Sequence, residues 1–526
     1  MNMKKRAELE EGAVLLLNKS KRGLLRLVFG RTAVVIALLL VQILLLFVGF
    51  LWLGEKYVYG GSLLMALAAA LAVMNRPGNP EAKITWILLI TLLPVFGVPF
   101  YCYVELELGH RLARAQLADI SKRTAALAPR APEALEALRA ADPGAAGLCA
   151  YVERAGNQPV CRNSAVDYFP AGEAVFEAIL EELARAESFI FLEYFIIEEG
   201  YMWGRILRLL EEKARAGVDV RVLYDGTCAV GKLPYQYPKK LEALGIQCRM
   251  YAPLRPLVST HYNNRDHRKI LVVDGRCAFT GGVNLADEYI NRRILHGHWK
   301  DTAVKITGEA VRSFTLMFLR MWAVEASLPE DCGRYLDASG PVDAPGWVLP
   351  YSDSPFDQER VGKLVYMDIL SRASRYVHIM TPYLIIDQEL AQALIFAAKR
   401  GVDVSIITPA RPDKRTVFAL TRSYYRQLLL GGVRIYEYTP GFVHGKMFVS
   451  DDRTAVVGSI NLDYRSLYLH FECAARFWDC PAVEAVERDM QATLAKCSRV
   501  TPEDCRRWPL GQRLLGWVLR PLAPLT

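Results

Sequence analysis

The sequence predicts an α/β protein with two tandem halves around a pseudo-twofold axis, preceded by N-terminal transmembrane helices. Three uncharged runs within the first 103 residues predict the membrane region, and a set of helix and strand patterns that occurs twice after residue 165 predicts the two halves. The length of 526 residues fits several domains, because one domain usually has about 100–200 residues.

The overall composition excludes several classes of protein. Lys and Arg total 64 against 56 Asp and Glu, and the resulting net charge of +8 is too small for a dedicated nucleic-acid binder. A hydrophobic fraction of 52% with 23% charged residues excludes general disorder. The eleven cysteines include no C-x-x-C pair, so neither a disulfide-stapled secreted scaffold nor a zinc site is expected.

Three uncharged runs occupy most of residues 33–108. They cover residues 33–53, 57–74 and 84–103, and the last contains Pro94 and Pro99. A membrane-spanning helix needs about 20 apolar residues, and the aromatic residues at the ends of these runs are typical of membrane interfaces. The sequence therefore predicts a multi-pass membrane protein.

The side of the membrane that carries the rest of the chain stays open. Residues 1–32 contain eight Lys and Arg, which predicts a cytoplasmic N-terminus. Three full crossings would place the remainder outside, whereas one re-entrant run would keep it in the cytoplasm. Residues 109–164 are expected to be a linker, in which 111–145 form a helix on the membrane surface or a solvated helix.

An internal duplication follows the linker. Three pairs of segments show the same succession of helix end, glycine stop and apolar strand: 184–197 with 371–386, 214–225 with 397–409, and 241–253 with 428–440. Short continuous apolar strands between helices are typical of buried α/β sheets. We expect one half at 165–304 and another at 361–500, joined by a connector at 305–360 with a helix at 311–326. A basic, apolar segment at 501–526 is expected to lie on the membrane or to cap the second half.

Each half contains the pattern H-x-K-x4-D-x6-G-[GS]-x-N, within residues 261–288 and 439–466. The motif residues are His267, Lys269, Asp274, Gly281, Gly282 and Asn284 in the first copy, and His444, Lys446, Asp451, Gly458, Ser459 and Asn461 in the second. Because strand side chains alternate, the His and Lys of each copy are expected on one face of a strand. Two matches at equivalent places in a duplicated chain point to chemistry rather than chance.

The paired motifs suit phosphodiester exchange without a metal. A neutral imidazole can attack phosphorus, while a second, protonated imidazole donates to the departing alkoxide and later accepts a proton from the incoming alcohol. The two lysines and the two asparagines, Asn284 and Asn461, are expected to hold the phosphate oxygens. No carboxylate cluster at ligand spacing accompanies the histidines, so we expect no catalytic metal and no cofactor.

The motifs and their flanks resemble the phospholipase D superfamily, and bacterial cardiolipin synthases in particular. The resemblance runs from about residue 57 to the C-terminus and includes NPEAKITWILLITLLPVFGVPFYCYVELELG before the repeat. It implies two phospholipase-D-like halves and transfer of a phosphatidyl group from one phosphatidylglycerol to another, with release of glycerol. By motif position it implies that His267 is the nucleophile and His444 the general acid and base. The apolar run at 33–53 is additional to the two spans of the simplest members.

Four carboxylates are expected to support this chemistry. Asp301 and Glu472 lie downstream of the two motifs and are predicted to orient the imidazoles. Asp274 and Asp451 belong to the signature of the superfamily, and we expect them to brace the strand and turn rather than to touch substrate.

Three alternatives to cardiolipin synthesis remain. The same intermediate could be discharged by water, as in a phospholipase or nuclease, although a membrane anchor argues against nucleic acid as a partner. Another alcohol could accept the phosphatidyl group, or the protein could be a non-enzymatic membrane scaffold. The complete pair of motifs argues against the scaffold, and the expected partners are phosphatidylglycerol and anionic membrane lipid in a bacterial cell membrane.

Overall fold

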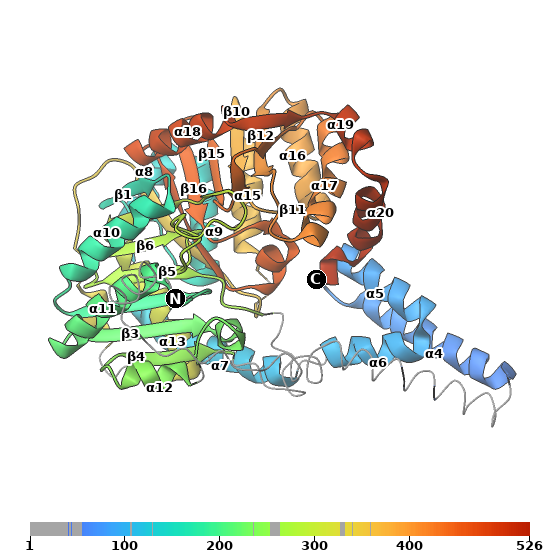
Figure 1. The fold of residues 1–526 in the computed structure, drawn as a ribbon, viewed down its shortest axis with the longest axis horizontal. Coiled ribbons are helices and arrows are strands. Elements are labelled where there is room, and N and C mark those ends of the chain that lie inside the picture. The colour runs from blue at the N-terminus through green and yellow to red at the C-terminus, as the bar shows by residue number, and fades with distance from the viewer. Residues whose placement is uncertain are drawn as a thin grey trace, which may run out of the picture.

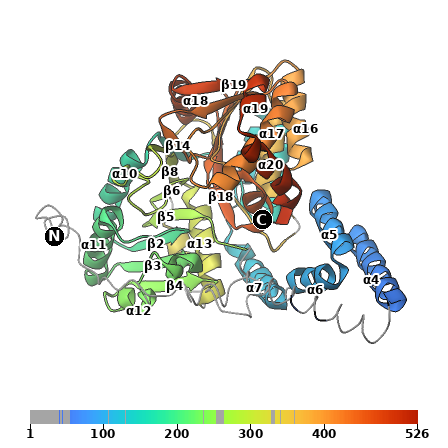
Figure 2. The ribbon, with the colours of Figure 1, turned by 45° about the vertical axis from the view of Figure 1, so that its right-hand side comes forward.

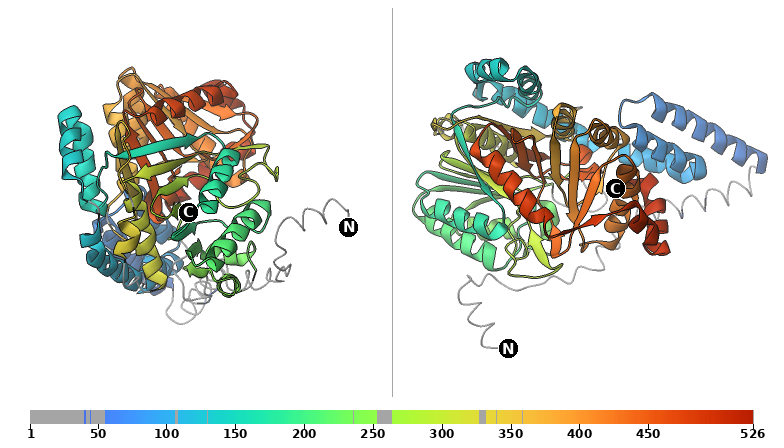
Figure 3. Two further views of the ribbon diagram at one scale, coloured as in Figure 1. Left: turned by 90° about the vertical axis from the view of Figure 1, so that its left-hand side faces the viewer. Right: turned by 90° about the horizontal axis from the view of Figure 1, so that it is seen from above.

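A computed structural model provides the coordinates of the protein. It describes residues 40, 44, 55–105, 108–128, 130–234, 236–252, 264–326, 332–338, 340–357 and 359–525. Figure 1 shows an α/β body with helices projecting from one side, and the turned views of Figures 2 and 3 show the same arrangement.

The projecting part consists of α4 (Glu55–Asn75), α5 (Pro80–Leu92) and α6 (Pro94–Glu105). The side chain of Asn79 caps α5 by accepting a hydrogen bond from the backbone N–H of Glu81 at 2.8 Å. Trp86, Ile90 and Tyr101 belong to a small core between these helices. We call residues 55–105 the N-terminal hairpin.

The N-terminal hairpin differs from three continuous spans. The expected span at 33–53 lies outside the described residues, apart from Leu40 and Leu44, and the span at 57–74 falls within α4. The span at 84–103 is divided between α5 and α6, because Pro94 lacks the N–H needed to continue α5 and begins a new helix. Among the described helices, none is both long enough and apolar enough to cross a bilayer.

The linker is a set of short helices instead of the expected single helix over 111–145. It contains α7 (Leu108–Thr124), the 3₁₀ turn η1 (Ala125–Leu127), α8 (Pro132–Ala141) and α9 (Pro143–Gly156). Prolines begin α8 and α9, and the Asp142 side chain caps α9 through the N–H of Ala145 at 3.0 Å. Leu138 and Val152 belong to the core of the second half, so α8 and α9 pack against the α/β body.

The first half is built on a seven-stranded mixed sheet with the order β1-β8-β6-β5-β2-β3-β4. Its strands are β1 (Ser164–Phe169), β2 (Phe189–Tyr194), β3 (Asp219–Asp225), β4 (Gln247–Tyr251), β5 (Lys269–Val273), β6 (Cys277–Gly281) and β8 (Ala303–Gly308). Its helices are α10 (Gly172–Ala184), α11 (Tyr201–Arg215) and α12 (Tyr237–Glu242), with the 3₁₀ turn η2 (Gly226–Val230). The connection to the second half contains α13 (Val311–Glu325), where a helix was expected, and α14 (Gly333–Leu336).

The second half repeats this sheet with one extra edge strand, in the order β19-β13-β12-β10-β15-β16-β18-β9. Its strands are β9 (Trp347–Asp353), β10 (Tyr376–Met380), β12 (Asp403–Pro409), β13 (Arg434–Tyr438), β15 (Met447–Ser450), β16 (Thr454–Gly458), β18 (Glu472–Trp478) and β19 (Cys497–Val500). Its helices are α15 (Val361–Arg372), α16 (Gln388–Lys399), α17 (Arg415–Leu430) and α18 (Pro481–Leu494). The order and the parallel or antiparallel sense of the equivalent strands agree between the sheets, which confirms the two tandem α/β halves.

A shared core lies between the two sheets, and further cores cover their outer faces. Along β5, Ile270 and Val272 face the shared core, whereas Leu271 and Val273 face the outer core of the first half. This alternation explains the uninterrupted apolar run of the sequence, because both faces of the strand are buried. The eleven cysteines all lie in the described part of the chain, and none of them forms a disulfide.

Two small two-stranded sheets and the C-terminal helices complete the fold. One small sheet joins the halves by pairing β7 (His298–Lys300) with β14 (Gly441–Val443), and the other pairs β11 (Leu384–Ile385) with β17 (Leu462–Asp463). After β17 follows the π-helical turn η4 (Arg465–Leu469), and α19 (Pro502–Arg507), α20 (Leu510–Leu519) and the 3₁₀ segment η5 (Arg520–Leu525) end the chain. Because Gly516 of α20 packs against Ala419 of α17, this segment covers the second half.

Candidate active site

The first motif histidine lies at a contact between the two halves. His267 stands just before β5, and its backbone N–H donates to the carbonyl of Phe471 at 2.9 Å. Asp266 and Phe471 form a parallel β-bridge between the two halves. The residues that follow them, His267 and Glu472, are therefore neighbours. His267 Nδ1 lies 2.8 Å from Glu472 Oε1.

The second motif histidine has the reciprocal arrangement. His444 follows β14, which pairs in parallel with β7 of the first half, and its N–H donates to the carbonyl of Lys300 at 2.7 Å. Asp301 follows β7 directly, and its Oδ2 lies 2.7 Å from His444 Nδ1. Each histidine is therefore held by a carboxylate of the opposite half.

These contacts determine which imidazole nitrogen is available for chemistry. An ionised carboxylate only accepts hydrogen bonds, so Nδ1 of each histidine carries the proton that it donates to Glu472 or Asp301. In a neutral imidazole the lone pair then lies on Nε2. In both rings Nε2 can therefore attack a phosphorus atom or accept a proton from an alcohol.

The fixed positions of the two motif copies differ only at Gly282 and Ser459. Each of these residues contacts the carboxylate that holds a histidine, Gly282 beside Asp301 and Ser459 beside Glu472. A Cβ at Gly282 would lie 2.0 Å from Asp301 Oδ1, so glycine leaves the space that Asp301 fills. Ser459 instead donates from Oγ to Glu472 Oε2 and accepts a hydrogen bond from the N–H of Cys473 at 3.0 Å. Glycine in one copy and serine in the other therefore both hold the carboxylate in position.

The two motif lysines are buried beside their histidines. Lys269 donates to the carbonyl of His267 and Lys446 to the carbonyl of His444, with Lys446 Nζ also 2.9 Å from His444 Nδ1. Both side chains are only about 1% exposed. Burial lowers the pKa of Lys269 to about 8 and that of Lys446 to about 7. An anion entering the site favours the protonated lysines.

Burial also keeps both imidazoles neutral at pH 7. Loss of solvation lowers the pKa of His267 to about 3 and that of His444 to about 4, against the opposing effect of Glu472 and Asp301. Lys269 lowers the pKa of both histidines, which shows that the two clusters share one electrostatic site.

The two carboxylates remain ionised in this site. Burial alone would raise the pKa of Glu472, but the neighbouring His267 brings it well below its ordinary value. The pKa of Asp301 is lowered in the same way, since the effect of His444 and Lys446 exceeds that of burial. Both groups can therefore stabilise positive charge on an imidazole during a reaction.

The two predicted phosphate-binding asparagines differ in their contacts. Asn284 accepts from the N–H of Ile196 at 3.0 Å and donates to the hydroxyl of Tyr289 at 2.8 Å. Asn461 is also buried, but its Oδ1 has no hydrogen-bond partner among the described residues. The amide nitrogen of Asn284 retains a second N–H beyond the one given to Tyr289, and this N–H can donate to substrate.

The motif aspartates lie at the opposite ends of their strands from the lysines. Asp274 accepts hydrogen bonds from the N–H groups of Glu187, Ser188 and Phe189, each at 2.8 Å. Asp451 does the same for Ser374, Arg375 and Tyr376 at 2.7–2.9 Å. Each aspartate adopts a positive φ, of 53° and 56°, in the turn that follows the strand. They stabilise the start of β2 and β10 and lie away from the histidines.

Sequence reasoning missed a third histidine in the site. His470 is 7% exposed, its ring centre lies 5.5 Å from that of His267, and its Nδ1 lies 3.8 Å from Glu472 Oε1. Neither of its ring nitrogens has a hydrogen-bond partner among the described residues. Its only sequence signal is its place two residues before Glu472, which puts both side chains on one side of an extended segment.

A buried charged network under His267 was also missed. Arg268 pairs with Glu193 of β2 at 2.5 Å and with Asp266 at 3.1 Å. Asp225, at the end of β3, accepts a hydrogen bond from the N–H of Asp266 at 3.1 Å. These contacts tie the backbone on both sides of His267 to the first sheet.

One group of side chains in the site could hold a metal ion. The ligand atoms of His267, His470 and Glu472 all lie within 4.8 Å of one another. Glu472, however, is already bonded to His267 and Ser459. A metal bound by Glu472 would share that carboxylate with His267 and Ser459.

Comparison with known proteins identifies the family. The family model described as "Cardiolipin synthase, PLD-like domain" matches residues 179–322 and 366–494, and one described as "Phospholipase_D-nuclease N-terminal" matches residues 63–102. The cardiolipin synthase of Geobacillus kaustophilus is 34% identical over 467 residues, which cover 87% of this chain and 91% of that protein. The chain belongs to the bacterial cardiolipin synthases of the phospholipase D superfamily. The resemblance seen in the sequence is therefore confirmed.

Other relatives extend over most of the chain. The cardiolipin synthase of another Geobacillus strain is 33% identical and covers 94% of this chain and 99% of its own length. An uncharacterised protein of Streptococcus mutans is 47% identical over 87% of this chain and all of its own length. The crystal structure of phosphatidylserine synthase from Haemophilus influenzae has a TM-score of 0.56 at 14% identity, covering 71% of this chain and 97% of that one, and shows the shared fold.

Proposed function

We propose that the protein is a phosphatidyltransferase that makes cardiolipin and glycerol from two molecules of phosphatidylglycerol. The observation that carries the proposal is the reciprocal pair of buried histidines, each bonded through Nδ1 to a carboxylate of the other half. Two imidazoles with free Nε2 atoms in one site suit a two-step transfer through a covalent intermediate. The cardiolipin synthases that resemble this chain over most of its length support this choice of reaction.

In the first step, Nε2 of neutral His267 attacks the phosphorus of one phosphatidylglycerol. The P–N bond forms, the bond from phosphorus to the head-group glycerol breaks, and protonated His444 gives its Nε2 proton to the departing oxygen. Glu472 stabilises the positive charge that develops on His267. Because His444 is neutral in the free site, it must gain its proton as the anionic phosphodiester enters and raises its pKa.

In the second step, a head-group hydroxyl of another phosphatidylglycerol replaces His267. His444 Nε2 accepts the hydroxyl proton, the new P–O bond forms and the P–N bond breaks, which restores both imidazoles. Lys269 and Lys446 hold the non-bridging oxygens, together with Asn284 and Asn461 once their amides face the substrate.

We also propose that the protein is a multi-pass membrane protein. The uncharged runs at 33–53, 57–74 and 84–103 support this, and the N-terminal hairpin exposes apolar side chains such as Leu63 and Leu64, each 69% exposed. Large apolar side chains open to water are unfavourable, whereas a lipid surface covers them. Carbonate washing of membranes should leave the protein in the pellet, and its release into the supernatant would contradict membrane insertion.

The central experiment identifies the products. Purified protein in detergent is supplied with phosphatidylglycerol, and lipids are assigned by mass. We expect cardiolipin with an equal amount of glycerol. Phosphatidic acid as the sole product would show a phospholipase instead, and a different diester formed with an added alcohol would show a broader acceptor range.

The roles of the two histidines are distinguished with a phosphatidyl donor whose leaving group needs no proton, such as a nitrophenyl phosphodiester. His267→Asn should abolish both turnover and the covalent adduct. His444→Asn should still form the adduct from this donor but discharge it about 10²–10⁴-fold more slowly, so that the adduct accumulates. An adduct on His444 in the His267→Asn variant would reverse the two roles.

A further inference from the structure

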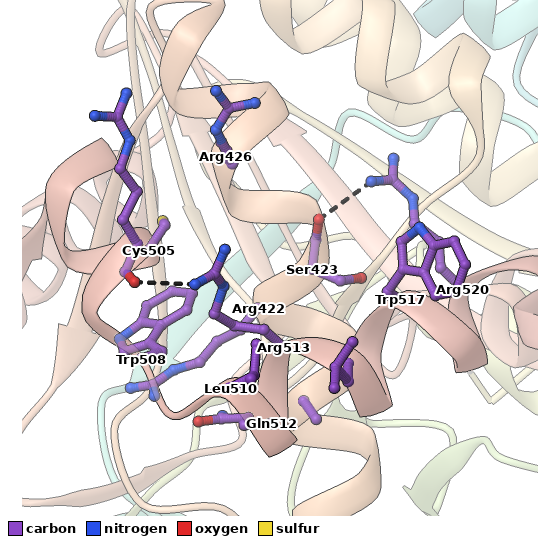
Figure 4. A pocket seen from close by; sticks show the side chains of 13 residues that line it. Arg422, Ser423, Arg426, Cys505, Trp508, Leu510, Gln512, Arg513, Trp517 and Arg520 are labelled. Atoms are coloured by element: carbon purple, nitrogen blue, oxygen red, sulfur yellow. Dashed lines mark hydrogen bonds between the residues drawn. The ribbon is translucent and has the colours of Figure 1, made fainter.

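A cavity lies apart from the histidines, between α17 and α20. Its volume is about 530 Å³, and Figure 4 shows the side chains that surround it. It is lined by Ala419, Arg422, Ser423, Arg426, Cys505, Arg506, Trp508, Leu510, Gln512, Arg513, Leu514, Trp517 and Arg520. We call it the C-terminal pocket, and it shares no residue with the catalytic cluster.

The C-terminal pocket is strongly basic. Five of its lining residues are arginines and none is acidic. Arg422 is bonded to Glu437 at 2.9 and 2.7 Å, and Arg520 donates to the carbonyl of Ser423 at 3.1 Å. Among the residues that the structure describes, Arg426, Arg506 and Arg513 have no carboxylate partner; the one bond of Arg513 in Figure 4 runs to the carbonyl of Arg506 at 3.1 Å.

The outer wall of the C-terminal pocket is apolar and open to solvent. On α20, Trp517 is 74% exposed, Leu510 66% and Leu514 53%. A helix with large exposed apolar side chains beside arginines is typical of a segment that lies in a membrane interface. A soluble anion would need the arginines but would leave these apolar side chains uncovered.

Close packing fixes this wall against the second half. A Cβ at Gly516 would lie 2.5 Å from the carbonyl oxygen of Ala419, so glycine allows the backbones of α20 and α17 to approach closely. The position of the exposed side chains relative to Arg426 on α17 is therefore set by the fold.

The C-terminal pocket also adjoins the N-terminal hairpin. Thr85 of α5 donates to the carbonyl of Pro521 at 2.5 Å, and Leu525 packs against the core of the hairpin. Figures 1 and 2 show α5 beside the C-terminal end of the chain. The exposed apolar side chains of Ile84 and Leu88 on α5 line a neighbouring cavity together with Trp517 of α20, so the two helices share one apolar surface.

We propose that the C-terminal pocket binds the phosphodiester head group of an anionic membrane phospholipid whose acyl chains lie along the exposed face of α20. The unpaired arginines supply charge complementarity to the phosphate, and Trp517 and the leucines cover the lipid glycerol and chains. This lipid is bound without being consumed, because the pocket shares no residue with the catalytic cluster. It holds the catalytic body against the membrane that supplies the substrate.

The test uses full-length His267→Asn protein in neutral detergent, so that the lipid is not turned over. Brominated phosphatidylglycerol and brominated phosphatidylcholine are titrated separately, and quenching of Trp517 is obtained by subtracting the signal of the same protein with Trp517→Phe. We expect half-saturation with phosphatidylglycerol at a concentration at least tenfold below that for phosphatidylcholine. Inorganic phosphate at millimolar concentration should not reverse the quenching.

Charge removal then tests the arginines. Each arginine near an anionic lipid contributes about fivefold in affinity, so Arg426→Gln with Arg513→Gln should weaken phosphatidylglycerol binding about 25-fold. Phosphatidylcholine binding should be unchanged. The matched control is Arg488→Gln with Arg499→Gln, which removes the same charge from exposed positions of the second half outside the pocket.

Three outcomes would overturn the proposal. Equal quenching by the two lipids would show that α20 meets the membrane without recognising charge. An equal loss of phosphatidylglycerol affinity in the control pair would show that only the net charge of the protein matters. Displacement of the lipid by inorganic phosphate would identify a soluble anion as the occupant. All these readouts are binding measurements, so they remain valid if the protein transfers phosphatidyl groups to an acceptor other than phosphatidylglycerol.

Discussion

Glu472→Gln removes one negative charge from the site with little change of shape. The glutamine carbonyl can still accept the Nδ1 proton of His267, and its amide can face Ser459, so the orientation of the imidazole is retained. Glu472 raises the pKa of His267, and its loss lowers that pKa further below about 3. His267 therefore stays neutral at pH 7, and any loss of rate reflects the reaction itself.

The size of the effect follows from the hydrogen bond that loses its charge. A buried hydrogen bond to a charged group contributes about 1.5–3 kcal/mol, and Glu472 acts mainly when the imidazole becomes positive on attack. At about 1.4 kcal/mol per tenfold change, formation of the adduct should slow about 10- to 150-fold.

The assay compares Glu472→Gln with Asp301→Asn, which makes the equivalent change beside His444. Release of glycerol from phosphatidylglycerol should fall in both variants. A nitrophenyl donor needs no proton from His444, so adduct formation should return to within about threefold of the unchanged protein in Asp301→Asn but not in Glu472→Gln.

Equal rescue of both variants by the nitrophenyl donor would refute this reasoning, since it would mean that Glu472 does not act through the nucleophile. A rate for Glu472→Gln within twofold of the unchanged protein would also refute it. The thermal unfolding midpoint of each variant should be measured as well, to show that a lower rate is not caused by unfolding.

Further predictions concern the lysines, metals and the glycine of the first motif. The pKa values are about 7 for Lys446 and about 8 for Lys269, so both lysines lose their positive charge as the pH rises through this range. We therefore expect kcat/KM to decline between pH 7 and 8. Lys446→Arg should shift this decline to higher pH. A chelator should leave turnover intact, and a loss restored by Mg²⁺ would require a metal in the reaction. Gly282→Ala should push Asp301 away from His444, lower stability by about 1–3 kcal/mol and reproduce the rescue pattern of Asp301→Asn.

The duplicated α/β body was predictable from the sequence because its strands are buried on both faces. Runs such as residues 270–273 are continuously apolar, and the same succession of helix, glycine and apolar strand occurs twice, so the sequence predicts two buried sheets. The N-terminal region was less predictable. Hydropathy alone describes 84–103 as one run, whereas Pro94 divides it into α5 and α6, and the prolines at 132 and 143 divide the linker. A backbone without an N–H ends a helix whatever the hydropathy around it.

The sequence by itself determined the reacting groups of this protein: two His and Lys pairs, their spacing on the strands, and the family. Only the tertiary structure decided which carboxylate serves which imidazole. His267 meets Glu472 across 205 residues of chain and His444 meets Asp301 across 143, and each contact crosses from one half to the other. Those pairings arise from parallel contacts between the halves, at Asp266 with Phe471 and at β7 with β14. Local sequence carries the chemistry of a side chain, but the partner that orients it is set by packing between segments that are distant along the chain.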